Sequence, residues 1–195
     1  EAFNAFNKTA IEVCEGQQMD MDFETRNDVT IHEYIEMIRL KTSVLLGAAL
    51  SLGAIIANAT REEKETLQLF GENIGISFQI QDDILDLYAD PTKFGKQVGG
   101  DVIANKKTIL QLTAITKANR EQLEIISQLQ TEADINFKVN RTKELFDHLD
   151  VKQDCIELMQ KHYNIALNAL ETINVPQNKK TPLIELAQFL ITRDL

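Results

Sequence analysis

Three carboxylates share one turn of a predicted helix in the segment of residues 78–86. Asp82 and Asp86 are four residues apart, which places one above the other on a helix, and Asp83 flanks the same face. Carboxylates at this spacing repel one another unless a cation lies between them. Oxygen ligands without His or Cys suit Mg²⁺, which also bridges to substrate phosphates. We therefore predict a magnesium site here, with a solvated acidic helix face as the alternative interpretation.

A glycine-rich segment that carries lysines, residues 92–107, follows these carboxylates. Lys96 and Lys106 lie ten and twenty residues after Asp86. The apolar neighbours of the carboxylates predict a mostly buried helix, where unpaired carboxylates are costly. Lysines on a glycine loop beside bound metal would neutralise a polyphosphate from the opposite side. The segment is not a Walker A element, because the glycine that this motif requires before Gly95 is missing.

The elements that position these residues are predicted to be helices, and the predicted class is all-α. Thr30 with Glu33, and Thr60 with Glu63, have capping-box spacing, each before apolar residues that recur every three or four positions. The second box predicts a helix over residues 61–88, which ends because Pro91 disfavours a helical residue before it. We expect the inward face of this helix to comprise Leu67, Phe70, Ile74, Phe78, Ile84 and Leu85.

Further helix boundaries follow from cap residues and apolar periodicity. The remaining predictions are a helix from Thr108 through Ala114, side-chain N-caps at Asn119 and Asp150, one amphipathic helix over residues 151–173, a linker over residues 174–180, and a final helix with Thr181 as cap and Pro182 in its first turn.

Composition limits the classes of protein that this chain can represent. The 195 residues are 44% hydrophobic and 26% charged, which is an ordinary globular mixture and fits one domain over residues 1–195. Twenty Lys and Arg against thirty Asp and Glu give a net charge of −10, which argues against a nucleic-acid partner. Few glycines and prolines argue against a β-sandwich or barrel.

The cysteines and the longest apolar run give expectations about compartment and membrane. Cys14 and Cys155 have no CxxC partner, so we expect small buried hydrophobes in a reducing cytosol rather than a disulfide. The apolar run of residues 44–57 is shorter than the ~20 residues of a membrane span, so we expect a buried core helix. No signal peptide is recognised, and a cytoplasmic location is predicted.

Five motifs in order resemble the trans-isoprenyl diphosphate synthases of the polyprenyl synthetase family, such as the farnesyl and geranylgeranyl diphosphate synthases. The motifs are Gly16-Gln17-Gln18-Met19-Asp20, Lys41-Thr42, Phe78-Gln79 followed by Asp82-Asp83-Ile84-Leu85-Asp86, Gly95-Lys96-x-x-Gly99-x-Asp101, and Asp101-x-x-x-Asn105-Lys106-x-Thr108. Asn105 stands where the family usually has Gly, a mild departure because Asn tolerates left-handed backbone. The set of five is specific, whereas each motif alone would be weak.

The resemblance implies an all-α bundle around a central cavity, usually a homodimer. It also implies a Mg²⁺-dependent prenyl transferase that joins an allylic diphosphate, such as dimethylallyl, geranyl or farnesyl diphosphate, to isopentenyl diphosphate. In this family Mg²⁺ ions on two aspartate-rich motifs draw diphosphate from the allylic substrate. The isopentenyl double bond then attacks the resulting carbocation, and a proton is lost.

The resemblance also assigns roles to individual residues. Asp82 is implied as the direct Mg²⁺ ligand, with Asp83 and Asp86 supporting it directly or through water. The other implied roles belong to Lys41 and Lys96 on the allylic diphosphate, Thr42 and Gln79 beside the cation, Lys106 at the phosphate loop, and Gln17 and Asp20 on the cavity wall. For each lysine, a solvated surface charge is the alternative.

One element of the family is missing from this sequence. The first DDxxD motif, upstream of GQxxD, is absent, as are the basic residues that bind isopentenyl diphosphate. Truncation explains this most simply: we expect the C-terminal portion of a synthase, without its N-terminal helices and inactive alone. A non-catalytic helical subunit of a heteromeric synthase is the alternative, although the intact second motif argues against it. The resemblance also implies that the residues that set product length lie near the missing motif.

Overall fold

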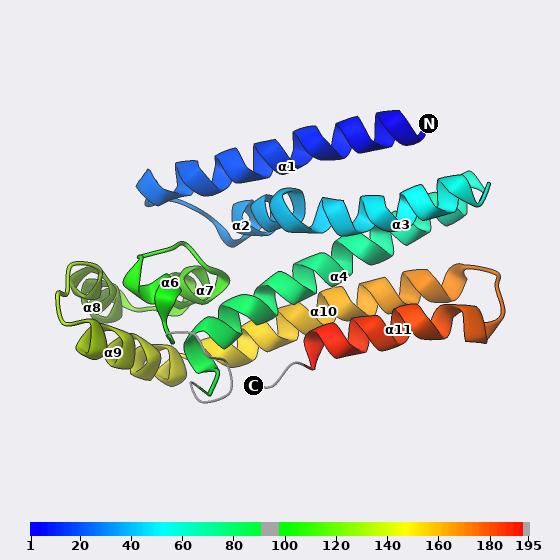
Figure 1. Cartoon of the computed structure of the whole chain (residues 1–195). Coiled ribbons are helices and arrows are strands. Elements are labelled where there is room, and N and C mark those ends of the chain that lie inside the picture. The colour runs from blue at the N-terminus through cyan, green and yellow to red at the C-terminus, as the bar shows by residue number, and fades with distance from the viewer. Residues whose placement is uncertain (91–97, 193–195) are drawn as a thin grey trace.

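The computed structural model describes residues 1–90 and 98–192, and Figure 1 shows them as a bundle of helices. No strand occurs among these described residues, which confirms the predicted all-α class. The helices are α1 (Ala2–Thr25), α2 (Ile31–Ile38), the π-helical turn η1 (Arg39–Ser43), α3 (Val44–Ile56), α4 (Arg61–Tyr88), α6 (Gly100–Ile103), α7 (Ile109–Lys117), α8 (Arg120–Gln130), α9 (Ile135–His148), α10 (Val151–Thr172) and α11 (Gln177–Ile191).

The central helix α4 packs between α3 and α10, while α1 lies along η1 and α3, and α11 lies beside α10 (Figure 1). The short helices α6 to α9 gather at one end of the bundle, next to the last turns of α4 (Figure 1). This end contains the C-terminal part of α4, where the three carboxylates of the aspartate-rich segment are located.

The predicted capping boxes form at both expected positions. Thr30 accepts a hydrogen bond from the backbone N–H of Glu33 and donates its own N–H to that side chain. The same reciprocal pair joins Thr60 and Glu63, and α4 begins and ends at the predicted residues. Asn119 forms a third box, with Gln122.

Apolar residues of α4 are central to both hydrophobic clusters of the bundle. Ile80 and Ile84 are fully buried in the larger cluster, together with Ile109 and Val151 from α7 and α10. Phe70 and Ile74 form the smaller cluster with α10 and α11. Of the predicted inward face, Phe70, Ile74, Ile84 and Leu85 are buried, and Leu67 and Phe78 are partly buried.

Glycines allow η1 to lie close to its two neighbouring helices. A Cβ on Gly16 of α1 would lie 2.3 Å from the backbone nitrogen of Lys41, and a Cβ on Gly75 of α4 would lie 2.7 Å from the Cα of Ser43. Side chains at either position would force the backbones apart. The π-helical turn that carries Lys41 and Thr42 is therefore held between α1 and α4.

The apolar run of residues 44–57 differs from the expectation in two respects. It continues α2 and η1 into one helix, Ile31–Ile56, which by length and composition could cross a membrane, although 44% of its most apolar window is buried. Buried core helices pass the same test. The run is also not wholly internal, because Leu45 is 58% exposed and Ile56 is 78% exposed.

The two cysteines form no disulfide, as expected, but only one is buried. Cys155 has no exposed surface and lies in the larger hydrophobic cluster. Cys14 is exposed on α1, so the expectation that both cysteines are core residues is wrong for this position.

Two helix starts near the C-terminus correct the predictions. Asp150 precedes α10 but adopts a left-handed conformation with φ of 54°, and its side chain makes no cap hydrogen bond. The last helix, α11, begins at Gln177 rather than after Thr181, and Pro182 lies inside it. Lys180 explains the earlier start, because its buried ammonium group donates to the backbone oxygen of Glu171 on α10 and draws this segment into the first turn.

We predict that Gly16→Ala destabilises the fold, because the added methyl group would meet the backbone of η1. Overpacking of this kind costs about 1–3 kcal/mol in the free energy of unfolding, which urea denaturation measures. Gly53→Ala is the matched control: a methyl group added there would have nothing within 4 Å, so the higher helix propensity of Ala should leave stability unchanged or raised. Equal stabilities of the two variants would contradict the close approach at Gly16.

Candidate functional site

Six of the ten predicted site residues meet at a cavity of about 620 Å³ between α1, α2, η1, α4 and the segment that follows α6. Its walls combine lysines, carboxylates and amides with a few apolar side chains. The predicted residues that line it are Asp20, Lys41, Thr42, Gln79, Asp83 and Lys106.

The π-helical turn η1 directs Lys41 and Thr42 into the cavity. Lys41 Nζ lies 2.6 Å from Asp20 Oδ2, and each of these two side chains is about one-third exposed. Asp20 follows Gly16 by one helical turn on α1, so the close approach at Gly16 also brings Asp20 to Lys41. Single π-helical turns inside α-helices often occur at functional sites, and periodicity alone did not predict this one.

A chain of side-chain hydrogen bonds connects η1 with α4. The Thr42 hydroxyl donates to Gln79 Oε1 (3.3 Å), and Gln79 Nε2 donates to Asp83 Oδ1 (3.3 Å). These bonds orient the Gln79 amide and leave the lone pairs of the Thr42 oxygen available to the cavity. The two neutral side chains form a polar wall without a full charge.

Asp83 is buried and accepts hydrogen bonds from three elements. Its Oδ2 accepts from the Tyr34 hydroxyl of α2 and from the backbone N–H of Ile109 at the start of α7 (3.1 Å). Burial raises the pKa of Asp83 to about 7, although the bonds from Tyr34 and Ile109 oppose this shift. Tyr34 was not predicted as a site residue, yet it lies seven residues, or two helical turns, before Lys41 and so shares its face.

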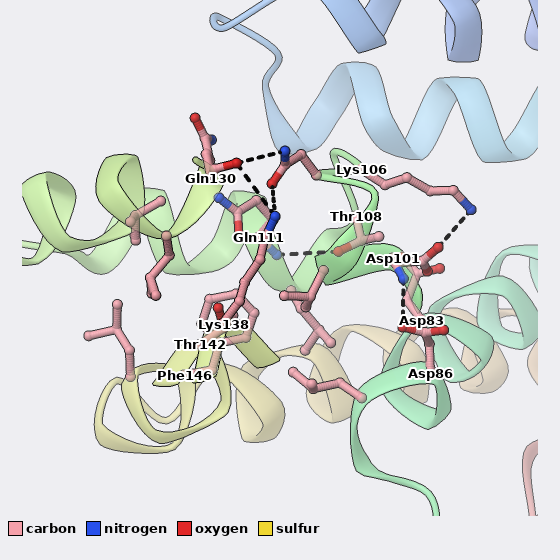
Figure 2. A pocket seen from close by; sticks show the side chains of 17 residues that line it. Asp83, Asp86, Asp101, Lys106, Thr108, Gln111, Gln130, Lys138, Thr142 and Phe146 are labelled. Carbon is pink, nitrogen blue, oxygen red and sulfur yellow. Dashed lines mark hydrogen bonds and ion pairs between the residues drawn. The ribbon is translucent and has the colours of Figure 1, made fainter. Parts of the chain in front are cut away.

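Asp86 anchors the segment that leads into α6. Its Oδ2 accepts from the backbone N–H of Asp101 (3.0 Å), and its backbone oxygen accepts from Gly99 (2.6 Å). Burial raises the pKa of Asp86 above its ordinary value, and the neighbouring Asp101 adds to this shift. Lys106 Nζ lies 2.6 Å from Asp101 Oδ1, so the lysine and both carboxylates form one connected group (Figure 2).

The remaining predicted residues are placed differently. Asp82 is partly buried on α4 but is not among the described residues that line the cavity. Gln17 is exposed on α1, and this structure does not bring it to the cavity wall. Lys96 lies outside the described residues. A smaller cavity of about 30 Å³, shown in Figure 2, adjoins the group and is lined by Asp83 and Asp86.

Within residues 1–90 and 98–192, no group of three or more His, Cys, Asp or Glu side chains is arranged to hold a metal ion by itself. Mg²⁺ does not require such a cage, because it commonly binds one or two carboxylates together with water and substrate phosphates. Asp82 and Asp86, one helical turn apart on α4, supply this kind of donor set. Asp83 lines the cavity and accepts hydrogen bonds at both of its oxygens, and its part in holding a metal ion stays a prediction.

We predict that Asp83→Asn reduces the pH dependence of stability in metal-free buffer. The ordinary pKa is 3.8, so between about pH 4 and pH 7 folded Asp83 holds a proton that the unfolded chain has lost. The free energy of unfolding therefore falls as pH rises through this window, by up to about 1.4 kcal/mol per pH unit. The amide lacks this ionisation, so urea denaturation from pH 5 to pH 8 should give a flatter profile for the variant. Identical slopes would show that Asp83 titrates at its ordinary pKa.

Curated relatives match nearly the whole chain. It is 37% identical to a geranylfarnesyl diphosphate synthase from Natronomonas pharaonis over 99% of this chain and 55% of the relative, and 34% identical to a geranylgeranyl diphosphate synthase from Methanosarcina mazei over 100% of this chain and 58% of the relative. The chain thus spans little more than half the length of these curated relatives.

Solved structures share the arrangement of helices. A crystal structure of a geranylgeranyl pyrophosphate synthase matches with a TM-score of 0.92 and 38% identity, over 100% of this chain and 61% of that chain. The geranylgeranyl pyrophosphate synthetase from Pyrococcus horikoshii also gives a TM-score of 0.92, with 33% identity over 99% of this chain and 58% of that chain. The family model described as polyprenyl synthetase matches residues 1–149, which include the entire cavity wall. The chain belongs to the polyprenyl synthetase family.

Proposed function

We propose that the cavity binds an allylic diphosphate together with Mg²⁺, and that the chain is part of a prenyl transferase. This enzyme would condense the allylic substrate with isopentenyl diphosphate in isoprenoid biosynthesis. The observation that carries the proposal is the meeting of Lys41, Lys106, Thr42 and Gln79 on the wall of one cavity of about 620 Å³. The names of the relatives support the same reaction class, because they are geranylfarnesyl and geranylgeranyl diphosphate synthases.

The two lysines provide the positive charge that a diphosphate requires. Each is paired with a carboxylate on the cavity wall, Lys41 with Asp20 and Lys106 with Asp101, at 2.6 Å. Both pairs are partly exposed, and such ion pairs contribute little to stability. The ammonium groups can therefore reorient toward a bound anion at a small cost in free energy. A bound diphosphate would then contact one lysine from η1 and one from the segment after α6.

Asp82 and Asp86 would hold Mg²⁺ jointly with the diphosphate oxygens, and Asp83 would support them by fixing α4 against α2 and α7. When bound, Mg²⁺ neutralises charge that develops on the departing diphosphate. The carboxylate of Asp86 on α4 is held in place by the backbone N–H of Asp101, in the first turn of α6, so its position depends on two helices.

Thr42 and Gln79 would form the part of the wall that faces the allylic carbon. Their oxygen lone pairs and dipoles can stabilise a carbocation. Because neither side chain is ionised, neither readily forms a covalent bond with the carbocation. The bond from Thr42 to Gln79 and the bond from Gln79 to Asp83 hold both groups in place before substrate binds, which reduces the reorganisation that the reaction needs. The homodimer and the cytoplasmic location expected from the sequence stay predictions.

We predict that Asp82→Ala and Lys41→Ala each weaken binding of inorganic diphosphate in the presence of Mg²⁺. Loss of a metal or phosphate partner should raise the Kd roughly 10-fold to 100-fold, as isothermal titration calorimetry measures. Asp82→Ala should not lower the Tm of the metal-free chain much, because Ala has a higher helix propensity than Asp at this interior position of α4. A fall in Tm that accounts for the lost binding would contradict the metal role.

Asp154→Ala is the matched control for loss of a carboxylate. Asp154 forms a partly exposed ion pair with Lys117 on the α7–α10 side of the bundle and does not line the cavity. Its Kd for magnesium diphosphate should equal that of the unmodified chain. If the unmodified chain binds no magnesium diphosphate, the proposed function is wrong and the helical partner subunit becomes the better hypothesis.

A further inference from the structure

Helix α9 carries a lysine whose ammonium group is buried among neutral oxygens. Lys138 is only 5% exposed, and its Nζ donates to Asn105 Oδ1 (2.8 Å), to the backbone oxygen of Ile103 (3.3 Å) and, at longer range, to that of Gln130 (3.5 Å). Within the part of the chain that the structure describes, Lys138 forms no ion pair with a carboxylate. A buried charge is costly unless it is well compensated, so these three oxygens must supply the compensation.

Two of the three oxygens belong to helix C-termini. Ile103 is the last residue of α6, and Gln130 is the last residue of α8. Backbone oxygens at a helix C-terminus lack intrahelical partners and carry partial negative charge. Lys138 therefore satisfies the ends of two helices with one ammonium group, and it ties α6 and α8 to α9.

The third oxygen belongs to a residue in an unusual backbone conformation. Asn105 has φ of 54°, in the left-handed region, which confirms the tolerance expected of Asn at this position. The backbone N–H of Asn105 donates to Val102 (3.2 Å), and that of Lys106 donates to Asp101 (3.0 Å). These two bonds form a Schellman motif, which ends α6 and sets the direction of the chain at Lys106.

The side chain of Asn105 is bound at both ends. Its Oδ1 accepts from Lys138, and its Nδ2 donates to the backbone oxygen of Gln130 (3.0 Å). Glycine would permit the same backbone conformation, but it could make neither bond. Asn105 thus replaces the conformational freedom of glycine with two fixed contacts to α8 and α9.

The turn presents charged groups to the proposed substrate cavity. Lys106 follows Asn105 directly, lines the cavity and pairs with Asp101, whose backbone N–H binds Asp86. Figure 2 shows this group on one side of the turn and Lys138 with Gln130 on the other. The segment from Asp101 to Lys106 is therefore anchored to α4 at one end and to Lys138 at the other.

We propose that Lys138 and Asn105 are positioning residues that fix Lys106 in the orientation in which it meets the substrate diphosphate. This inference rests on the proposed function. Lys138 acts through the turn, because its ammonium group is occupied by Asn105 and the two helix ends. If this is correct, loss of either the Lys138 or the Asn105 side chain weakens diphosphate binding only through its effect on Lys106.

A double-mutant cycle tests this route of action. Lys138→Met and Asn105→Gly should each raise the Kd for inorganic diphosphate with Mg²⁺ roughly 10-fold, as expected for residues that orient a ligand contact. In a Lys106→Ala background, neither change should raise the Kd further. Equal losses with and without Lys106 would show a general structural effect and overturn the proposal, as would no loss in either background.

Two controls separate positioning from loss of fold. Arg141→Gln removes a positive charge from an exposed position of the same helix and should leave the Kd unchanged. Asn105→Gly retains the buried lysine and permits the left-handed turn, so we expect it to fold even if Lys138→Met proves unstable. It should still bind diphosphate more weakly, because it lacks the two side-chain contacts of Asn105. A Kd for Asn105→Gly equal to that of the unmodified chain would overturn the role of the side-chain anchor.

Amide hydrogen exchange distinguishes this inference from the proposed function, because it requires no ligand. The Lys106 N–H should exchange faster in Lys138→Met and Asn105→Gly than in the unmodified chain, while amides of α4 keep their protection. If the unmodified chain fails to bind magnesium diphosphate, the proposed function is wrong, but faster exchange would still support the anchoring of the turn. Unchanged exchange at Lys106 would overturn the anchoring itself.

Discussion

The arrangement of the site depends on the hydrogen bonds that the buried carboxylate of Asp83 accepts. It accepts bonds from Tyr34 on α2, from Gln79 on its own helix and from the first N–H of α7. A carboxylate without water must have such partners, so the three elements cannot move independently. Because Thr42 joins the same network through Gln79, the same constraint places the face of η1 that lines the cavity.

The cavity combines both signs of charge in a chain with a net charge of −10. Overall charge argued against an anionic macromolecule, yet Lys41 and Lys106 face one cavity and are held there by Asp20 and Asp101. The acidic partners keep the lysines ordered without substrate, and their partial exposure keeps these pairs weak. A small anion would fit this balance better than a nucleic-acid backbone, because the lysines of the cavity wall are few and lie close to carboxylates.

Much of the fold could be predicted because it follows from local rules. The capping boxes at Thr30 and Thr60 set helix starts correctly, and the bounds of α4 follow from its periodicity and from the proline beyond it. Predictions failed where tertiary contacts override local preference. The buried Lys180 contact to α10 moves the start of α11 upstream, and Asp150 adopts a left-handed turn that prevents it from capping. The exposed Cys14 shows the same limit, since residue type alone does not determine burial.

For the site, the sequence by itself determined which residue types are available and in which order: carboxylates one turn apart, a lysine–threonine pair, and a turn with Asn at a left-handed position. Tertiary structure alone decided their partners. It placed Asp83 inside a hydrogen-bond network, left Gln17 exposed on α1, and brought Tyr34 and Lys138 into contact with site residues. The physical reason is that caps and periodicity act over a few residues, whereas these contacts join positions that are 33 and 49 residues apart, which only the packing of helices brings together.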